Sequence, residues 1–151
     1  MESVTIRKIR HDELPALLAL YRHLHVDAPG IVIDANLERL WDRIYQDPQL
    51  HYLGAEVDGK IVSTCTMAVV PNLTNGAKPY GLIENVVTHP DFRKRGFGTQ
   101  VLQAALKIAW GADCYKVMLL TGRKDPATLR FYEQAGFLSG IKTGFVAWRC
   151  G

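Results

Sequence analysis

A glycine-containing turn between a predicted strand and a predicted helix limits the possible folds of this chain more than any other feature. The stretch from Tyr80 to Gln100 reads YGLIENVVTHPDFRKRGFGTQ. Its first part is rich in apolar residues and predicts a strand, which is interrupted at His89-Pro90. The turn that follows is basic, and from Thr99 the apolar residues recur at helical spacing.

This turn predicts an anion-binding site. The first backbone N–H groups of a helix have no partner within the helix, and the helix dipole is positive at that end. Glycine lets a phosphate approach the main chain, and successive N–H groups can form a nest around a pyrophosphate. The turn is neither a P-loop, because no Gly-Lys-Ser/Thr follows, nor a dinucleotide fingerprint, because Val101 replaces the third glycine. The alternative interpretation is a basic surface loop that caps an ordinary helix.

The pattern Arg-x-x-Gly-x-Gly, from Arg93 to Gly98, resembles the turn with which GCN5-related N-acetyltransferases (the GNAT superfamily) bind the pyrophosphate of acetyl-CoA. The residues V-V-T-H-P-D-F-R around it and R-F-Y-E-Q-A-G-F at Arg130–Phe137 support the resemblance. The resemblance implies one GNAT domain over residues 1–151 and acetyl-CoA as co-substrate, without a metal. It places contacts to CoA at Val86, Val87, Thr88, Arg93, Lys94, Arg95, Gly96, Phe97, Gly98, Thr99, Thr128 and Phe131.

Acetyl transfer from a thioester to an amine requires a base, a donor to the carbonyl oxygen and an acid for the departing thiolate. Glu84 is the candidate base, because a carboxylate inside an apolar strand is expected to be buried and so tuned for proton transfer. The resemblance assigns the backbone N–H groups near Val86 and Val87 to the carbonyl and Tyr132 to the leaving sulfur. The alternatives are a salt-bridged or edge-facing Glu84 and a core tyrosine.

Two neighbouring positions complicate this assignment. Asn85 is expected to point to the opposite sheet face from Glu84, unless a bulge intervenes. Asp125 stands where the family often has asparagine, and its carboxylate is expected to cap a helix but to repel phosphates. Thr128 likewise replaces a common alanine.

The order of the elements predicts an α/β fold with a mixed sheet and helices on both faces. Strands are expected at Val4–Ile9, His51–Val57, Lys60–Val70, Tyr80–Val87, Cys114–Thr121 and Ile141–Arg149, and helices at His11–His25, Ala35–Gln46, Thr99–Ala109 and from Pro126 to Gly136. The resulting order is β-α-α-β-β-β-α-β-α-β, with Asp58-Gly59 as a two-residue hairpin turn. The last strand is expected to close the sheet.

Composition limits the location and partners of the protein. A net charge of +3 is too small to predict nucleic acid as the partner, although Arg93–Arg95 leaves a nucleic-acid binder as an alternative. The three cysteines form no C-x-x-C pair, and no apolar leader or membrane-spanning run is present, so we expect a cytoplasmic protein with reduced thiols and no membrane partner. The five histidines show no metal-ligand spacing.

The acceptor is the least constrained part of the prediction. We expect a primary amine of a small molecule, with direct transfer in a ternary complex; a protein or peptide amine is an alternative. The segments G-L-I-E-N-V-V at Gly81–Val87 and C-Y-K at Cys114–Lys116 are similar to glucosamine-6-phosphate N-acetyltransferases. A non-catalytic acyl-CoA-binding module on the same fold is the competing class. The family resemblance also allows a homodimer.

Overall fold

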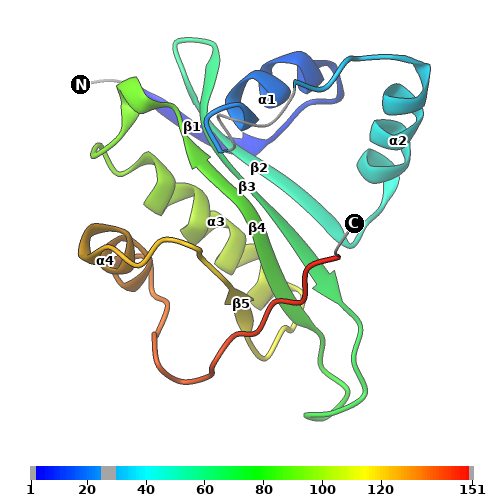
Figure 1. Ribbon diagram of the computed structural model, residues 1–151. Helices are drawn as coiled ribbons and strands as arrows, with labels where there is room; N and C mark the ends of the chain where they lie inside the picture. The colour runs from blue at the N-terminus through cyan, green and yellow to red at the C-terminus, as the bar shows by residue number, and fades with distance from the viewer. Residues whose placement is uncertain (1–2, 25–29, 150–151) are drawn as a thin grey trace.

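A computed structural model describes residues 3–24 and 30–149 of the chain. A five-stranded sheet has the order β1-β2-β3-β4-β5, with β5 parallel to β4 and the other neighbours antiparallel (Figure 1). The strands are β1 (Val4–Lys8), β2 (Leu50–Val57), β3 (Lys60–Val70), β4 (Tyr80–Thr88) and β5 (Val117–Leu119). The helices are α1 (Leu14–Tyr21), α2 (Ala35–Gln46), α3 (Phe97–Gly111) and α4 (Pro126–Gln134), with 3-10 turns at His11–Glu13 and Pro90–Phe92.

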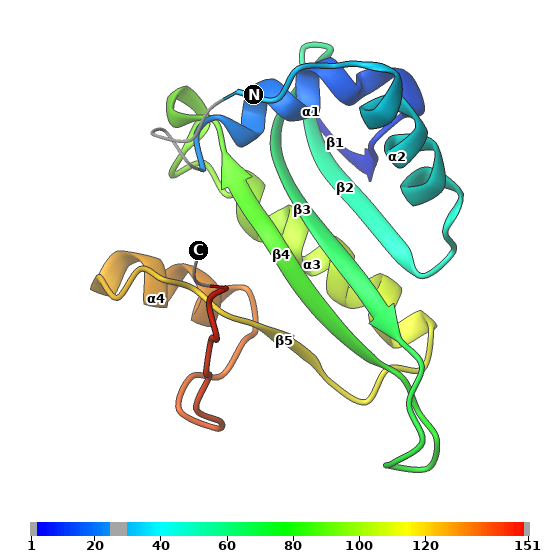
Figure 2. The same cartoon turned by 45° about the vertical axis from the view of Figure 1, so that its right-hand side comes forward.

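Helices cover both faces of the sheet, as the sequence predicts (Figures 1 and 2). Helix α3 places Val101, Leu102 and Ala105 against the strands, where each is at most 1% exposed. On the other face, Leu17 of α1 and Trp41 of α2 belong to a second buried cluster. The mixed α/β fold class is therefore confirmed.

Local turn and cap chemistry agrees with the sequence. Asp58 and Gly59 both have positive φ angles, 51° and 79°, which is the primed turn expected between β2 and β3. Asp34 caps α2 by accepting a hydrogen bond from the backbone N–H of Leu37. Some boundaries differ: α1 ends at Tyr21 rather than His25, which lies outside the described residues, α3 begins two residues before Thr99, and β5 is shorter than Cys114–Thr121.

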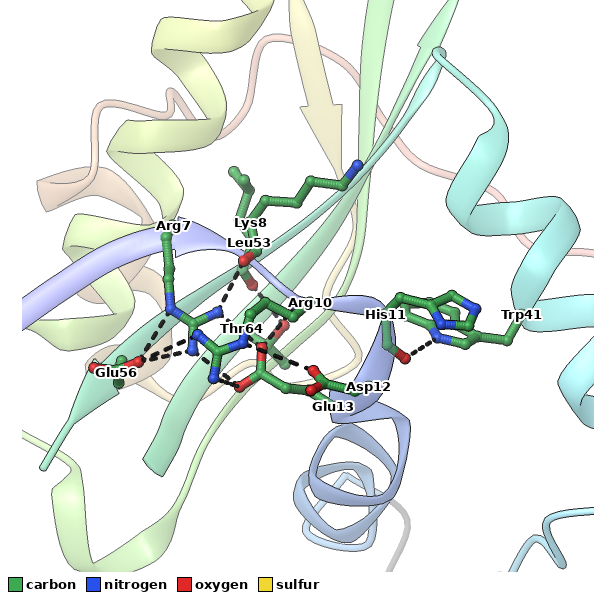
Figure 3. Close-up of polar contacts among 10 residues, drawn as sticks. All are labelled: Arg7, Lys8, Arg10, His11, Asp12, Glu13, Trp41, Leu53, Glu56 and Thr64. Carbon is green, nitrogen blue, oxygen red and sulfur yellow. Dashed lines mark hydrogen bonds and ion pairs between the residues drawn. The ribbon is translucent and has the colours of Figure 1, made fainter. Parts of the chain in front are cut away.

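A cluster of ion pairs joins the first strand to the entry of α1 (Figure 3). The Arg7 guanidinium contacts the carboxylates of Glu13 and Glu56, each at 2.8 Å. The hydrogen bond from Arg7 lowers the pKa of Glu13, so this carboxylate stays ionised at neutral pH. Nearby, Trp41 Nε1 donates to the backbone carbonyl of His11 at 2.8 Å. These contacts hold α1 and α2 on their face of the sheet.

The prediction of a last strand at Ile141–Arg149 is wrong. Residues 141–149 contain no strand, and Phe145 and Val146 are 89% and 57% exposed. A strand needs a hydrogen-bonded neighbour as well as an alternating sequence. Here β5 offers only three paired residues, and Gly144 instead lies against the side chain of Leu120.

Within the described residues, no helix is both long and apolar enough to cross a membrane.

Candidate functional site

A β-bulge at Asn85 opens the sheet between β4 and β5. Thr64 pairs with Val87 and Thr66 pairs with Glu84, so two residues of β4 stand opposite the single residue Cys65. Asn85 adopts a left-handed conformation with φ of +54°. Pairing with β5 ends just before the bulge, at Ile83, and beyond it the two strands diverge (Figure 2). The bulge that the sequence analysis left as a condition is therefore present.

The opening exposes backbone donors of β4. The N–H of His89 donates to the carbonyl of Val62 on the β3 side, and N–H groups alternate in direction along a strand. By this alternation, the N–H group of Thr88 points to the open side and that of Val87 points to β3, while Val86 lies in the bulge, where the alternation is interrupted. Thr88 can thus donate to a ligand between the strands, whereas Val87 is 5% exposed and belongs to the core.

The turn that follows β4 leads directly into α3. Lys94 and Gly96 have positive φ angles of 62° and 83°, and the N–H of Gln100 is the first to bond within the helix, to the carbonyl of Gly96. The preceding N–H groups, those of residues 97–99, therefore have no partner inside the helix. Arg93 donates from Nε to the carbonyl of Thr88 at 3.1 Å, which fixes the start of the turn. This geometry suits an anion.

These elements border one cleft of about 870 Å³ between β4 and β5. It brings together all but one of the residues predicted for catalysis or CoA binding: Glu84, Val86, Val87, Thr88, Arg93, Lys94, Gly96, Phe97, Gly98, Thr99, Thr128, Phe131 and Tyr132. Arg95 is not among the lining residues; its guanidinium lies over the ring of Phe92 at 5.2 Å. A role for Arg95 in binding stays a prediction.

Glu84 and Tyr132 lie on opposite sides of the gap. Glu84 is exposed, so the expectation that its strand buries it is wrong; it pairs with Thr66 of β3, but pairing with β5 has ended one residue before it, at Ile83. Within residues 3–24 and 30–149 its carboxylate takes part in no salt bridge, which leaves it available to a ligand. Burial, together with the smaller electrostatic effects of Cys65 and Glu84, raises the pKa of Tyr132. Its phenol therefore stays protonated at neutral pH.

Asp125 acts as the predicted cap of α4. Its carboxylate accepts hydrogen bonds from the backbone N–H and the hydroxyl of Thr128 and from Arg123 Nε, at 2.9 to 3.1 Å. These interactions, with the Thr128 backbone first, lower the pKa of Asp125. The pairing with Arg123 offsets the repulsion that a free carboxylate would exert on a phosphate.

Several lining residues were missed by sequence reasoning. They come from the turn after α1, the bulge, the loop after β5 and α4: Leu24, Asn85, Leu120, Thr121, Gly122, Arg123, Ala127, Arg130 and Gln134. The loop after β5 carried a usable signal, because ligands bind outside the carboxyl ends of parallel strands. The turn after α1 carried none, since its approach to β4 is set by tertiary packing.

Comparison with known proteins gives a consistent result. The model of the acetyltransferase (GNAT) family matches residues 17–137. A solved structure from Agrobacterium tumefaciens str. C58, named as an acetyltransferase, is 43% identical, covers 96% of this chain and 99% of its own, and has a TM-score of 0.90. Glucosamine 6-phosphate N-acetyltransferase of Trypanosoma brucei brucei is 35% identical over 79 residues, about half of each chain (52%). Aminoglycoside N-acetyltransferase AAC(6')-Iy, solved in complex with CoA, shares the fold at 20% identity, a TM-score of 0.78 and coverage of 99% of this chain and 97% of its own.

We predict that Gly98→Ala destabilises the floor of the cleft. A Cβ at Gly98 would lie 2.9 Å from Cζ of Phe131 and 3.2 Å from Oγ1 of Thr88, and that hydroxyl is held by Ser63 at 2.8 Å. Overpacking of this kind costs about 1–3 kcal/mol of unfolding free energy, measured by urea titration.

Gly111→Ala is the matched control, because Gly111 lies in the same helix and a Cβ there meets no atom within 4 Å. The control is expected to be neutral or slightly stabilising. Equal unfolding free energies for the two variants would contradict the close packing of α3 on α4.

Proposed function

Because the chain belongs to the acetyltransferase (GNAT) family, we propose that it transfers the acetyl group of acetyl-CoA to the primary amine of a small molecule, with both bound together in the cleft. The observation that carries this proposal is the placement of Glu84 and Tyr132 across the gap beside the N-terminus of α3. One cleft thus presents a carboxylate, a neutral phenol, open strand donors and an anion site.

The residues present fit acetyl-CoA. The N–H groups at the start of α3 suit the pyrophosphate, with Arg93 and Lys94 beside them. The open edge of β4, with the N–H group of Thr88, offers a hydrogen bond to an extended pantetheine arm. AAC(6')-Iy, which has the same fold, was solved in complex with CoA, and this supports CoA as the ligand.

The chemistry then divides among three groups of this chain. Glu84 accepts the proton that the attacking amine loses, directly or through a water molecule. The Val86 N–H donates to the carbonyl oxygen as that oxygen gains negative charge. Tyr132 donates its phenol proton to the sulfur as the carbon–sulfur bond breaks, and its raised pKa keeps this proton in place beforehand.

An amino sugar phosphate is the first acceptor to test. The similarity to the trypanosomal glucosamine 6-phosphate N-acetyltransferase supports this choice, although it spans about half of each chain.

The proposal includes a cytoplasmic location, because the free thiols of Cys65 and Cys114 suit a reducing compartment. It includes no nucleic-acid partner, since the net charge of +3 is small and Arg93 and Lys94 border the cleft proposed for CoA.

The proposal also includes a homodimer formed through residues 141–149. Two features of the described residues of one copy suggest this: β5 pairs there only with β4, and residues 141–149 are assigned no strand. A second copy supplies the complement of each, as twofold symmetry requires. Six large apolar side chains lie 57–89% exposed there: Leu120, Leu138, Ile141, Phe145, Val146 and Trp148.

The exposed area agrees with what a stable dimer needs. An aromatic side chain carries roughly 150–250 Å² and the aliphatic ones somewhat less, so the six expose on the order of 900 Å² per copy. Stable interfaces bury about 800 Å² per partner. The segment also touches Leu120, a cleft residue, so the partner would border the same cleft.

We predict that the protein releases free thiol from acetyl-CoA only when a suitable amine is present, and that Tyr132→Phe lowers kcat about 100-fold or more. The affinity for acetyl-CoA is expected to stay nearly unchanged, because the phenol acts on the departing sulfur. A thiol-detecting assay with amino sugars, amino acids, polyamines and aminoglycosides measures both effects.

Tyr115→Phe is the control, since Tyr115 lies outside the cleft-lining set. Acetyl-CoA binding without thiol release for any amine would favour the non-catalytic module. An unchanged kcat in Tyr132→Phe would remove Tyr132 from the mechanism.

We predict a solution mass of twice 16.9 kDa at micromolar concentration, measured by light scattering after gel filtration. Phe145→Ser is expected to shift this mass towards the monomer. Leu73→Ser is the control, because Leu73 is 93% exposed but lies on the loop between β3 and β4. A monomeric wild type would contradict the dimer.

A further inference from the structure

A row of polar side chains crosses the sheet beside Glu84. Tyr52 of β2 stands directly opposite Thr66 of β3, and Thr66 stands directly opposite Glu84 of β4. Directly opposed residues share a face of the sheet, with Cβ atoms roughly 4.5–5.5 Å apart. Helix α1 covers this face, and its residue Tyr21 places its hydroxyl 3.4 Å from Oγ1 of Thr66.

The phenols on this row stay neutral. Burial raises the pKa of Tyr21 to about 12, and burial also raises the pKa of Tyr52. The hydroxyl of Thr66 interacts with both phenols. Tyr132 from α4 interacts electrostatically with Glu84, and Tyr21 from α1 interacts with Tyr52 and Cys65. The other ionisable groups that border the cleft with Glu84 are His23, Arg93, Lys94, Arg123 and Arg130.

Thr66 is the one member of the row with a neighbour on each side. A threonine hydroxyl donates one hydrogen bond and accepts two. When Tyr21 donates to Oγ1 of Thr66, the proton of Thr66 remains for the carboxylate of its neighbour on β4. When the Glu84 carboxyl is protonated, it can instead donate a hydrogen bond to the Thr66 hydroxyl. Thr66 can therefore bond either protonation state of Glu84, and the charge-assisted bond to the ionised carboxylate is the stronger of the two.

We propose that Thr66, held by Tyr21, is a positioning residue that orients the Glu84 carboxylate towards the acceptor amine. The inference rests on the proposed role of Glu84 as base. Thr66 itself is absent from the cleft lining and does not touch the reacting atoms. Its contribution passes through Glu84, since a fixed carboxylate keeps the geometry that proton transfer requires.

The test is Thr66→Val, which removes the hydroxyl and keeps the shape of the side chain. We expect kcat to fall about 10-fold with an unchanged KM for acetyl-CoA. The acid limb of the pH–rate profile should move to higher pH, because a carboxylate that loses a hydrogen-bond donor binds its proton more tightly. Thr66→Ser keeps the hydroxyl and is expected to retain the wild-type kcat and the wild-type acid limb. Tyr21→Phe is expected to move the acid limb in the same direction as Thr66→Val, but by less.

Thr5→Val on β1 is the control for loss of a threonine hydroxyl from an exposed strand position. In a Glu84→Gln background, Thr66→Val is expected to have no further effect. If Glu84→Gln slows the reaction and Thr66→Val does not, the positioning role of Thr66 is rejected while the role of Glu84 as base stands. The inference would also be overturned if the loss of kcat in Thr66→Val is equal at every pH, persists in the Glu84→Gln background and is also seen in Thr66→Ser. If Glu84→Gln leaves the rate unchanged, the proposed base falls first and the inference with it.

Discussion

The extra residue that β4 inserts at Asn85 is the constraint on which the site depends. A bulge bends its strand and increases the local twist. In this sheet it coincides with the point where β4 stops pairing with β5, at Ile83. The gap exposes backbone N–H donors that would be hydrogen-bonded to the neighbouring strand in an unbroken sheet. Without the bulge, β4 would continue its ladder and the sheet would have no room for an extended ligand arm.

The same strand also positions the other end of the ligand. Because β4 leads through a short turn into α3, the open donors and the helix N-terminus lie in one continuous stretch of chain. Gly98 allows α3 to approach Phe131 of α4, and Asp125 fixes the start of α4. The position of Tyr132 opposite Glu84 therefore follows from packing around the turn.

Local chemistry in the sequence predicted most of the fold. The primed hairpin turn at Asp58-Gly59, the Asp34 and Asp125 caps and the strand–turn–helix unit all depend on neighbouring residues, and all are present. Non-local features escaped prediction. The exposure of Glu84 depends on the divergence of β5, and the contact of Tyr21 with Thr66 depends on where α1 packs. The strand predicted at Ile141–Arg149 failed because its pattern specifies no pairing partner.

Calorimetric titration with acetyl-CoA tests the central claim most directly, with free CoA and AMP as comparisons. If the gap beside the bulge receives the pantetheine arm while the start of α3 receives the pyrophosphate, acetyl-CoA and CoA should bind at micromolar concentration and AMP far more weakly. Equal binding of AMP and acetyl-CoA, or no binding by the folded protein, would contradict the account. The turn at Gly96–Gly98 would then be only a helix cap.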